Sequence, residues 1–141
     1  MSTIDFFRDG EIATLTLNNP GKLNAINLGM WNALAQKMAE ISVDRSIRCV
    51  VLRGAGSEAF AAGGDLEEFV TGRATLEQAL HYHGQVALAL QAIDTCPHPT
   101  VALIQGACIG GGLEIAGVCD FRICGASARL GAPINRLGFS M

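Results

Sequence analysis

A glycine triplet followed by a glutamate is the part of this sequence best suited to chemistry. Residues 110–112 are all glycine and stand between a β-branched apolar run, 100–104, and a short apolar stretch that begins at Leu113. The run predicts a buried strand, and the stretch predicts a short helix that ends at Gly117 or soon after. The first amides of a helix have no partner within it, so they point outward at a site for negative charge. Because Glu114 follows within one turn, the pattern predicts half of an oxyanion hole beside an acid/base carboxylate.

Two simpler interpretations of the same stretch stay open on the residues alone. Glycines between a strand and a helix also permit close packing of the helix on a sheet. Glu114 could be a helix residue that only faces solvent. A second loop of small residues, 58–66, favours the functional interpretation because it repeats the strand–glycine–helix organisation. In that loop Asp65 stands near the predicted helix start, where a carboxylate is more often a cap than a catalyst.

Motifs for metal binding and for a nucleophile are weak. The five cysteines include no CxxC pair, and no GxSxG elbow exists. His81 and His83 are two residues apart, so they do not share a helix face. We therefore predict no metal site, and the unpaired cysteine pattern indicates a reducing compartment, either the cytoplasm, which we favour, or an organelle matrix.

The amino-acid composition limits the kinds of partner that this chain can bind. Of the 141 residues, 50% are hydrophobic and 16% are charged, against roughly 25% charged in ordinary domains. So few charged residues predict that a partner subunit or further sequence covers part of the surface. The net charge of −3 shows no basic stripe for nucleic acid, and no apolar run reaches the ~18 residues of a membrane span. Residues 130–141 end in a predicted loop without a closing element, so we expect the domain, 1–141, to be part of a longer chain.

The remaining pattern alternates strands and helices. Strands over 4–8 and 11–17 flank an Asp9-Gly10 turn, which is a strong hairpin signal. The other predicted elements are a helix over 27–41, a helix over 75–95 with a capping box of Thr75 and Gln78 at its start, and strands over 49–52 and 119–124. A strand–helix–strand order requires a partly parallel sheet, so the fold class is α/β. The helix over 75–95 is expected to pack on this sheet through its apolar positions, Leu76, Leu80, Val86, Leu90 and Ile93.

Two separated motifs resemble the enoyl-CoA hydratase/isomerase (crotonase) family. They are AFAAGGDL at 59–66 and IQGACIGGGLE at 104–114, and NPGKLNA at 19–25 and CD at 119–120 also match. The similarity covers essentially the whole chain in the expected order. It implies a crotonase/ClpP-like spiral of ββα units, of which this sequence would be the N-terminal core. The C-terminal helical region, which in the family helps to form trimers and closes over the acyl pocket, would then be missing. A homotrimer or a dimer of trimers is the assembly that the resemblance implies.

The resemblance also implies an acyl-CoA thioester as substrate, with coenzyme A present only as part of that substrate. It places the two oxyanion-hole amides at Gly64 and Gly111 and the acid/base at Glu114. The family's CoA-binding positions fall on Lys22, Leu23, Ala25, Ala62, Asp65 and Leu66, together with the two oxyanion glycines. A basic residue often follows in the family where this chain has Glu67.

One departure from the family pattern leaves the reaction open. Hydratases of the family carry a second glutamate after Gly-x-Pro, whereas here residues 131–133, Gly-Ala-Pro, precede Ile134. Isoleucine cannot transfer a proton, so Glu114 would act alone or with Asn135 as a substitute partner. The resemblance implies hydration or isomerisation of an enoyl-CoA. The alternatives are a non-catalytic CoA-thioester-binding or assembly module, or a sister reaction such as decarboxylation, thioester hydrolysis or dehalogenation.

Overall fold

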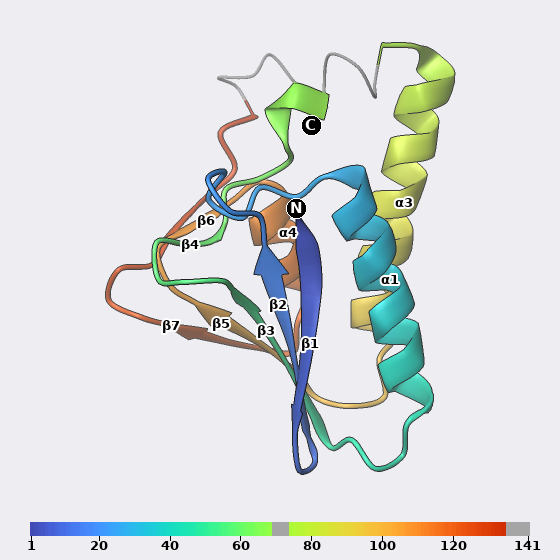
Figure 1. Cartoon of the computed structure of the whole chain (residues 1–141), viewed down its shortest axis with the longest axis vertical. Helices are drawn as coiled ribbons and strands as arrows, with labels where there is room; N and C mark the ends of the chain where they lie inside the picture. Colours follow the sequence, from blue (N-terminus) through green and yellow to red (C-terminus); the bar gives the residue numbers. More distant parts are fainter. Residues whose placement is uncertain (69–73, 135–141) are drawn as a thin grey trace.

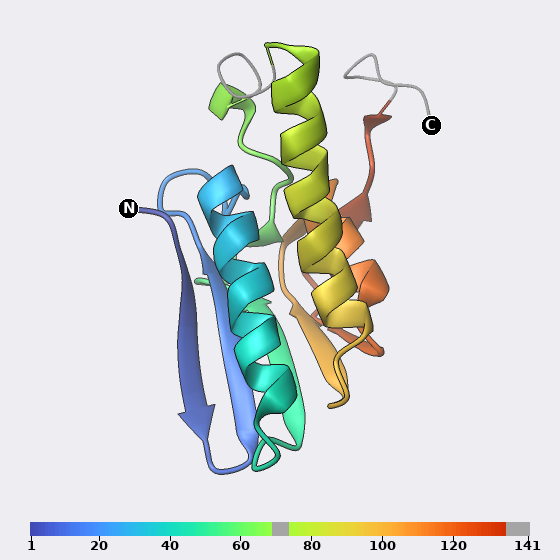
Figure 2. The same cartoon turned by 90° about the vertical axis from the view of Figure 1, so that its right-hand side faces the viewer.

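Two sheets flanked by helices make up the computed structural model (Figure 1), which describes residues 1–68 and 74–134. The large sheet has the order β1-β2-β3-β5-β7, and the small sheet has the order β4-β6-β8. The strands are β1 (Thr3–Asp9), β2 (Ile12–Asn18), β3 (Cys49–Gly54), β4 (Ala59–Ala61), β5 (Thr100–Ile104), β6 (Ala107–Ile109), β7 (Phe121–Cys124) and β8 (Arg129–Gly131). The helices are α1 (Leu28–Val43), α3 (Leu76–Asp94) and α4 (Gly111–Val118), and residues 66–68 are also helical. Helices α1 and α3 stand side by side along one face of the large sheet (Figure 2).

From β3 onward the chain winds as a spiral that adds one strand to each sheet at every turn. Strand β1 pairs with β2 antiparallel around Gly10, whose φ of 57° suits glycine, and this confirms the predicted hairpin. The other strand pairs within both sheets are parallel. The pairs β3/β4, β5/β6 and β7/β8 each send their first strand to the large sheet and their second to the small one. The predicted α/β spiral of ββα units is therefore confirmed.

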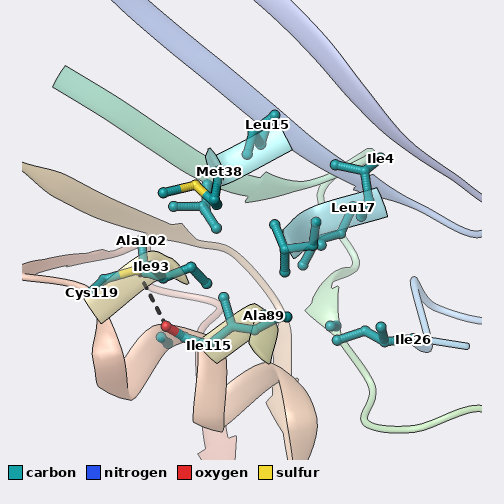
Figure 3. Packing of buried hydrophobic residues seen from close by; sticks show 14 of the residues in the cluster. Ile4, Leu15, Leu17, Ile26, Met38, Ala89, Ile93, Ala102, Ile115 and Cys119 are labelled. Carbon is teal, nitrogen blue, oxygen red and sulfur yellow. Dashed lines mark hydrogen bonds between the residues drawn. The ribbon is translucent and has the colours of Figure 1, made fainter. Parts of the chain in front are cut away.

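The core lies between the large sheet and the helices. Along β2 every second residue is buried, including Leu15 and Leu17, because side chains alternate between the two faces of a strand. Met38 of α1, Ile93 of α3 and Ile115 of α4 meet this face from the helical side (Figure 3). The core thus joins β2 to the helix that carries the glycine triplet, and it fixes α4 in place.

Helix α3 begins as predicted but packs on a different face. The Thr75 hydroxyl accepts from the Gln78 amide and the Gln78 side chain accepts from the Thr75 amide, so the capping box is confirmed. Leu76 and Leu80, however, are 77% and 64% exposed, and the prediction that they pack on the sheet is wrong. The buried positions of α3 are Tyr82, Ala89 and Ile93. These lie on another side of the helix from the leucine row and turn toward α1 and α4. Within the described residues, no helix has the length and apolar character needed to cross a membrane.

Candidate active site

The two glycine loops leave neighbouring strands at the same edge of the small sheet. Strand β4 pairs in parallel with β6, so the loops that follow them begin side by side. A Cβ placed on Gly110 would stand 3.7 Å from the Cα of Gly63, and one on Gly63 would stand 3.5 Å from the carbonyl oxygen of Ile109. The structure therefore brings the loop 62–65 and the glycine triplet into contact, although they are about 45 residues apart in sequence.

Two backbone N–H groups at this junction make no hydrogen bond to the described part of the protein. Gly64 is held from both sides: the Ile26 amide donates to the Gly63 carbonyl at 2.7 Å, and the Asp65 amide donates to the Ile26 carbonyl at 2.9 Å. Its own N–H has no acceptor within residues 1–68 and 74–134. Gly111 is the first residue of α4, and its N–H is likewise unpaired there. Backbone N–H groups inside a protein nearly always have a hydrogen-bond partner. Because these two have none among the described residues, they are available to a ligand.

Each glycine of the triplet has its own physical requirement. Gly110 precedes the helix with φ 50° and ψ −115°, a conformation that favours glycine. A Cβ on Gly112 would stand 2.5 Å from the Ala61 carbonyl oxygen, so only glycine lets α4 lie this close to β4. The packing interpretation of the triplet therefore holds for Gly112. It leaves the N–H of Gly111 open at the helix start.

A buried aromatic pair closes the space behind Gly111. A Cβ on Gly111 would stand 3.0 Å from Cζ2 of Trp31 and 3.7 Å from Cδ1 of Ile26. Trp31 is 2% exposed, and its indole N–H donates to the Tyr82 hydroxyl at 3.1 Å, which ties α1 to α3. The side of Gly111 on which a Cβ would stand thus faces buried apolar groups. The sequence predicted both helices, but no local signal indicated that Trp31 lies against Gly111.

The titratable groups near the triplet divide into one exposed carboxylate and one inert thiol. Glu114 lies in the first turn of α4 and is exposed, whereas the next residue, Ile115, is buried. Its backbone N–H donates to the Gly110 carbonyl at 2.9 Å, the bond that starts the helix. Cys108 of β6 is fully buried, and this burial raises the pKa of its thiol to about 11. The thiol is therefore protonated at neutral pH and unsuited to nucleophilic attack.

The position of the family's second carboxylate lies near the same edge. Strand β8 pairs with β6, and the Gly110 amide donates to the Gly131 carbonyl at 3.0 Å. The segment that leaves β8 therefore starts beside the triplet, and Ile134 follows half-buried in it. Asn135 lies outside the described residues.

The residues assigned to CoA binding come from two segments that hydrogen-bond to each other. The Ala62 amide donates to the Leu23 carbonyl at 3.0 Å, and the Lys22 ammonium contacts the Asp65 carboxylate at 2.8 Å. Leu23 and Leu66 expose their side chains, whereas Ala25 is buried. The structure therefore brings the segments 22–25 and 62–66 together beside Gly64.

Two hollows among the described residues are lined by residues other than Gly64, Gly111 and Glu114. One of about 190 Å³ is lined by Arg53, Gly54, Gly56, Ala59, Leu103 and Gln105. Another of about 390 Å³ lies between residues 18–24 and 55–59 and reaches Leu23.

Comparison with known proteins decides the family. The enoyl-CoA hydratase/isomerase family model matches residues 8–141. The chain belongs to the enoyl-CoA hydratase/isomerase family. A solved structure from Magnetospirillum magneticum, an enoyl-CoA hydratase/carnithine racemase, matches with a TM-score of 0.96 and 50% identity, covering 100% of this chain and 53% of that one.

The relatives of this chain in the family include both hydratases and isomerases. The short-chain-enoyl-CoA hydratase of Clostridium acetobutylicum is 32% identical over 94% of this chain and 50% of its own length. The mitochondrial Delta(3,5)-Delta(2,4)-dienoyl-CoA isomerase of Dictyostelium discoideum is 34% identical over 89% of this chain and 46% of its own length. The chain therefore spans about half the length of the relatives it matches. Proteins of this family bind acyl-CoA substrates.

Proposed function

We propose that the protein carrying this chain is an acyl-CoA enzyme that stabilises a thioester enolate. The observation that supports this most is the pair of unpaired N–H groups, on Gly64 and Gly111, that adjacent loops present at one edge of the small sheet. A carboxylate, Glu114, stands within one helical turn of the second amide. In this proposal the two amides form the oxyanion hole and Glu114 is the acid/base.

The proposed chemistry uses each group for one task. The thioester oxygen accepts both N–H groups, and these bonds strengthen as negative charge moves onto that oxygen in the enolate. Preorganised donors of this kind contribute on the order of 3–4 kcal/mol each to transition-state stabilisation. The positive end of α4 adds to the effect at Gly111. Glu114 takes the proton from C2, the carbon next to the thioester, and returns it to C2 in an exchange or to C4 in an isomerisation, which a carboxylate can do when it is within hydrogen-bond reach.

In this proposal two segments hold coenzyme A, and the second of them contains Gly64. Residues 22–25 and 62–66 offer backbone groups and the exposed apolar side chains of Leu23 and Leu66. The 390 Å³ hollow continues from Leu23 toward residues 55–59 and gives space for an extended ligand. Ala62, Asp65 and the two oxyanion glycines complete the proposed binding surface.

Ile134 determines which reaction the complete protein favours. With one carboxylate the site supports proton transfer at C2, and we expect the protein to exchange that proton or isomerise an enoyl-CoA faster than it adds water. Ile134→Glu is expected to introduce hydration, because a second carboxylate near the triplet can orient and deprotonate water. Mass spectrometry of an enoyl-CoA panel incubated in D₂O measures both reactions, as deuterium gained by the acyl chain at C2 or C4 and as the gain of one water.

Ile134→Gln is the matched control, since glutamine is similar in size to glutamate but cannot act as a base. Hydration that rises equally in both variants, or in neither, would contradict the assignment of position 134 to the missing carboxylate.

A second candidate function is a CoA-thioester-binding or assembly module without turnover. The half-buried Ile134 in place of a carboxylate and the exposure of Glu114 favour it. It predicts that the complete protein binds acyl-CoA and produces no hydrated, isomerised, exchanged or hydrolysed product from the panel. A single product above the uncatalysed background excludes it.

A further inference from the structure

The ammonium group of Lys22 is engaged by two carboxylates from the loop that contains Gly64. Its Nζ lies 2.8 and 3.1 Å from the two carboxylate oxygens of Asp65 and 2.6 Å from Oε2 of Glu67. Lys22 and Asp65 are 43 residues apart in the chain, so the contact ties two separate loops. It adds to the backbone bonds from Ala62 and Ile26 that join the same two loops.

The two carboxylates differ in how much their contact with Lys22 stabilises the loop. The Asp65 side chain is 8% exposed, and its Oδ1 also accepts from the Glu67 amide at 3.2 Å. A carboxylate so removed from water needs a partner, because an uncompensated buried charge is strongly unfavourable. The Glu67 side chain is 81% exposed, and an ion pair in water contributes little. The contact with Asp65 is therefore the one that fixes the loop.

Asp65 directly follows Gly64, so a shift of Asp65 also moves Gly64 and its amide. The loop on the Lys22 side is itself held in a costly conformation, since Leu23 and Asn24 have φ values of 50° and 56°. Asn24 anchors that loop through its side-chain amide, which donates to the carbonyls of Ala55 and Ala59 at 3.0 and 2.9 Å. Lys22 thus connects a rigid support to the residue that follows the first oxyanion donor.

We infer that Lys22 is a positioning residue, which holds the Gly64 amide in place through Asp65 rather than binding the substrate's phosphates. This inference rests on the proposed function, in which Gly64 is an oxyanion donor. The hydrogen bonds that Lys22 donates to the Asp65 and Glu67 carboxylates raise the pKa of its ammonium group, which therefore stays charged across the neutral range. The cluster of one ammonium and two carboxylates has a net negative charge, and it gives an incoming phosphate no uncompensated cation.

The test is the kinetic effect of Lys22→Met in the complete protein. We expect kcat for an enoyl-CoA to fall about 10- to 100-fold, the loss that a misplacement of about 1 Å produces, while the Kd for CoA stays near the wild-type value. Lys22→Arg is expected to restore most of kcat, because a guanidinium also reaches a carboxylate. In an Asp65→Asn background the Lys22→Met substitution should have little further effect, because its partner charge is already gone.

Glu67→Gln is the matched control, because it removes the exposed contact of the same ammonium and keeps the one with Asp65. We expect it to leave kcat close to wild type. If Lys22→Met instead raises the Kd for CoA about tenfold or more with kcat unchanged, as loss of a charged hydrogen bond to a ligand would, Lys22 is a phosphate ligand and the inference is wrong. A Glu67→Gln effect as large as that of Lys22→Met also overturns it.

Hydrogen exchange separates this inference from the proposed function. In Lys22→Met the amides of Ile26, Ala62 and Asp65, which bond across the two loops, should exchange faster, whereas the Arg48 amide, which donates to Glu11 far from the site, should not. If the wild-type protein turns over no acyl-CoA but these amides respond, the proposed function fails and the loop contact stands. If turnover is normal and the amides do not respond, the loop contact is wrong and the proposed function stands.

Discussion

Glu114→Gln is expected to lower the turnover of enoyl-CoAs by the complete protein about 10²- to 10⁴-fold, the usual contribution of a positioned acid/base group. Glutamine keeps the size and the exposed position of the side chain in the first turn of α4 but cannot accept the proton. The amides of Gly64 and Gly111 are untouched, so the affinity for CoA should stay nearly unchanged. The measurements are kcat on the enoyl-CoA panel and the Kd for CoA by calorimetry.

The structure offers a control that separates proton transfer from a general charge effect. Glu77 is also an exposed glutamate in the first turn of a helix, in this case α3. Glu77→Gln therefore removes the same charge from an equivalent helix position away from the glycine loops, and we expect kcat to stay at the wild-type value. If Glu114→Gln is as active as Glu77→Gln, Glu114 is not the acid/base and only faces solvent.

Local sequence rules predicted those elements whose limits depend on a few neighbouring residues. The Asp9-Gly10 turn closes the hairpin because the glycine adopts a left-handed conformation there. Thr75 and Gln78 form the predicted capping box at the start of α3. The strand over 100–104 was predicted with the bounds that the structure shows. In each case the deciding interaction lies within a few residues of the element itself.

The contacts between elements were not predictable in the same way. The apolar residues of α3 form more than one row, and the sequence does not indicate which row the core covers; the structure buries Ala89 and exposes Leu80. Trp31 and Tyr82 are 51 residues apart, and only the packing of α1 on α3 brings them together. The pairing of Lys22 with Asp65 similarly depends on how two distant loops meet.

The candidate site combines both kinds of information. The exposed amide of Gly111 follows from the general rule that a helix start leaves N–H groups unpaired, so one half of the site could be predicted from the triplet alone. The second half depends on the parallel pairing of β4 with β6, which places Gly63 against Gly110. The resemblance to a known family supplied that long-range relation, whereas composition and periodicity did not.

The close approach of α4 to β4 is the packing contact on which the relative position of the two loops depends. Gly112→Ala would place a methyl group 2.5 Å from the Ala61 carbonyl oxygen and 3.0 Å from its Cβ. Neither group can move without moving the strand, so α4 must shift outward and carry the Gly111 amide away from Gly64. We expect the free energy of unfolding to fall by about 1–3 kcal/mol, the usual cost of overpacking. We expect kcat to fall about 10²-fold, because a small misplacement of catalytic groups has that effect.

Gly117→Ala, in the same helix, is the matched control, and denaturant unfolding together with kcat measures both variants. A Cβ on Gly117 would meet no atom within 4 Å, and Gly117 is an exposed residue of α4. Alanine there should raise the free energy of unfolding by about 0.5–1 kcal/mol, since glycine is unfavourable within a helix, and leave kcat unchanged. The same glycine-to-alanine substitution should thus lower the free energy of unfolding at position 112 and raise it at position 117. If Gly112→Ala is as stable and as active as Gly117→Ala, α4 does not need to lie against β4, and the alignment of the two amides does not depend on this contact.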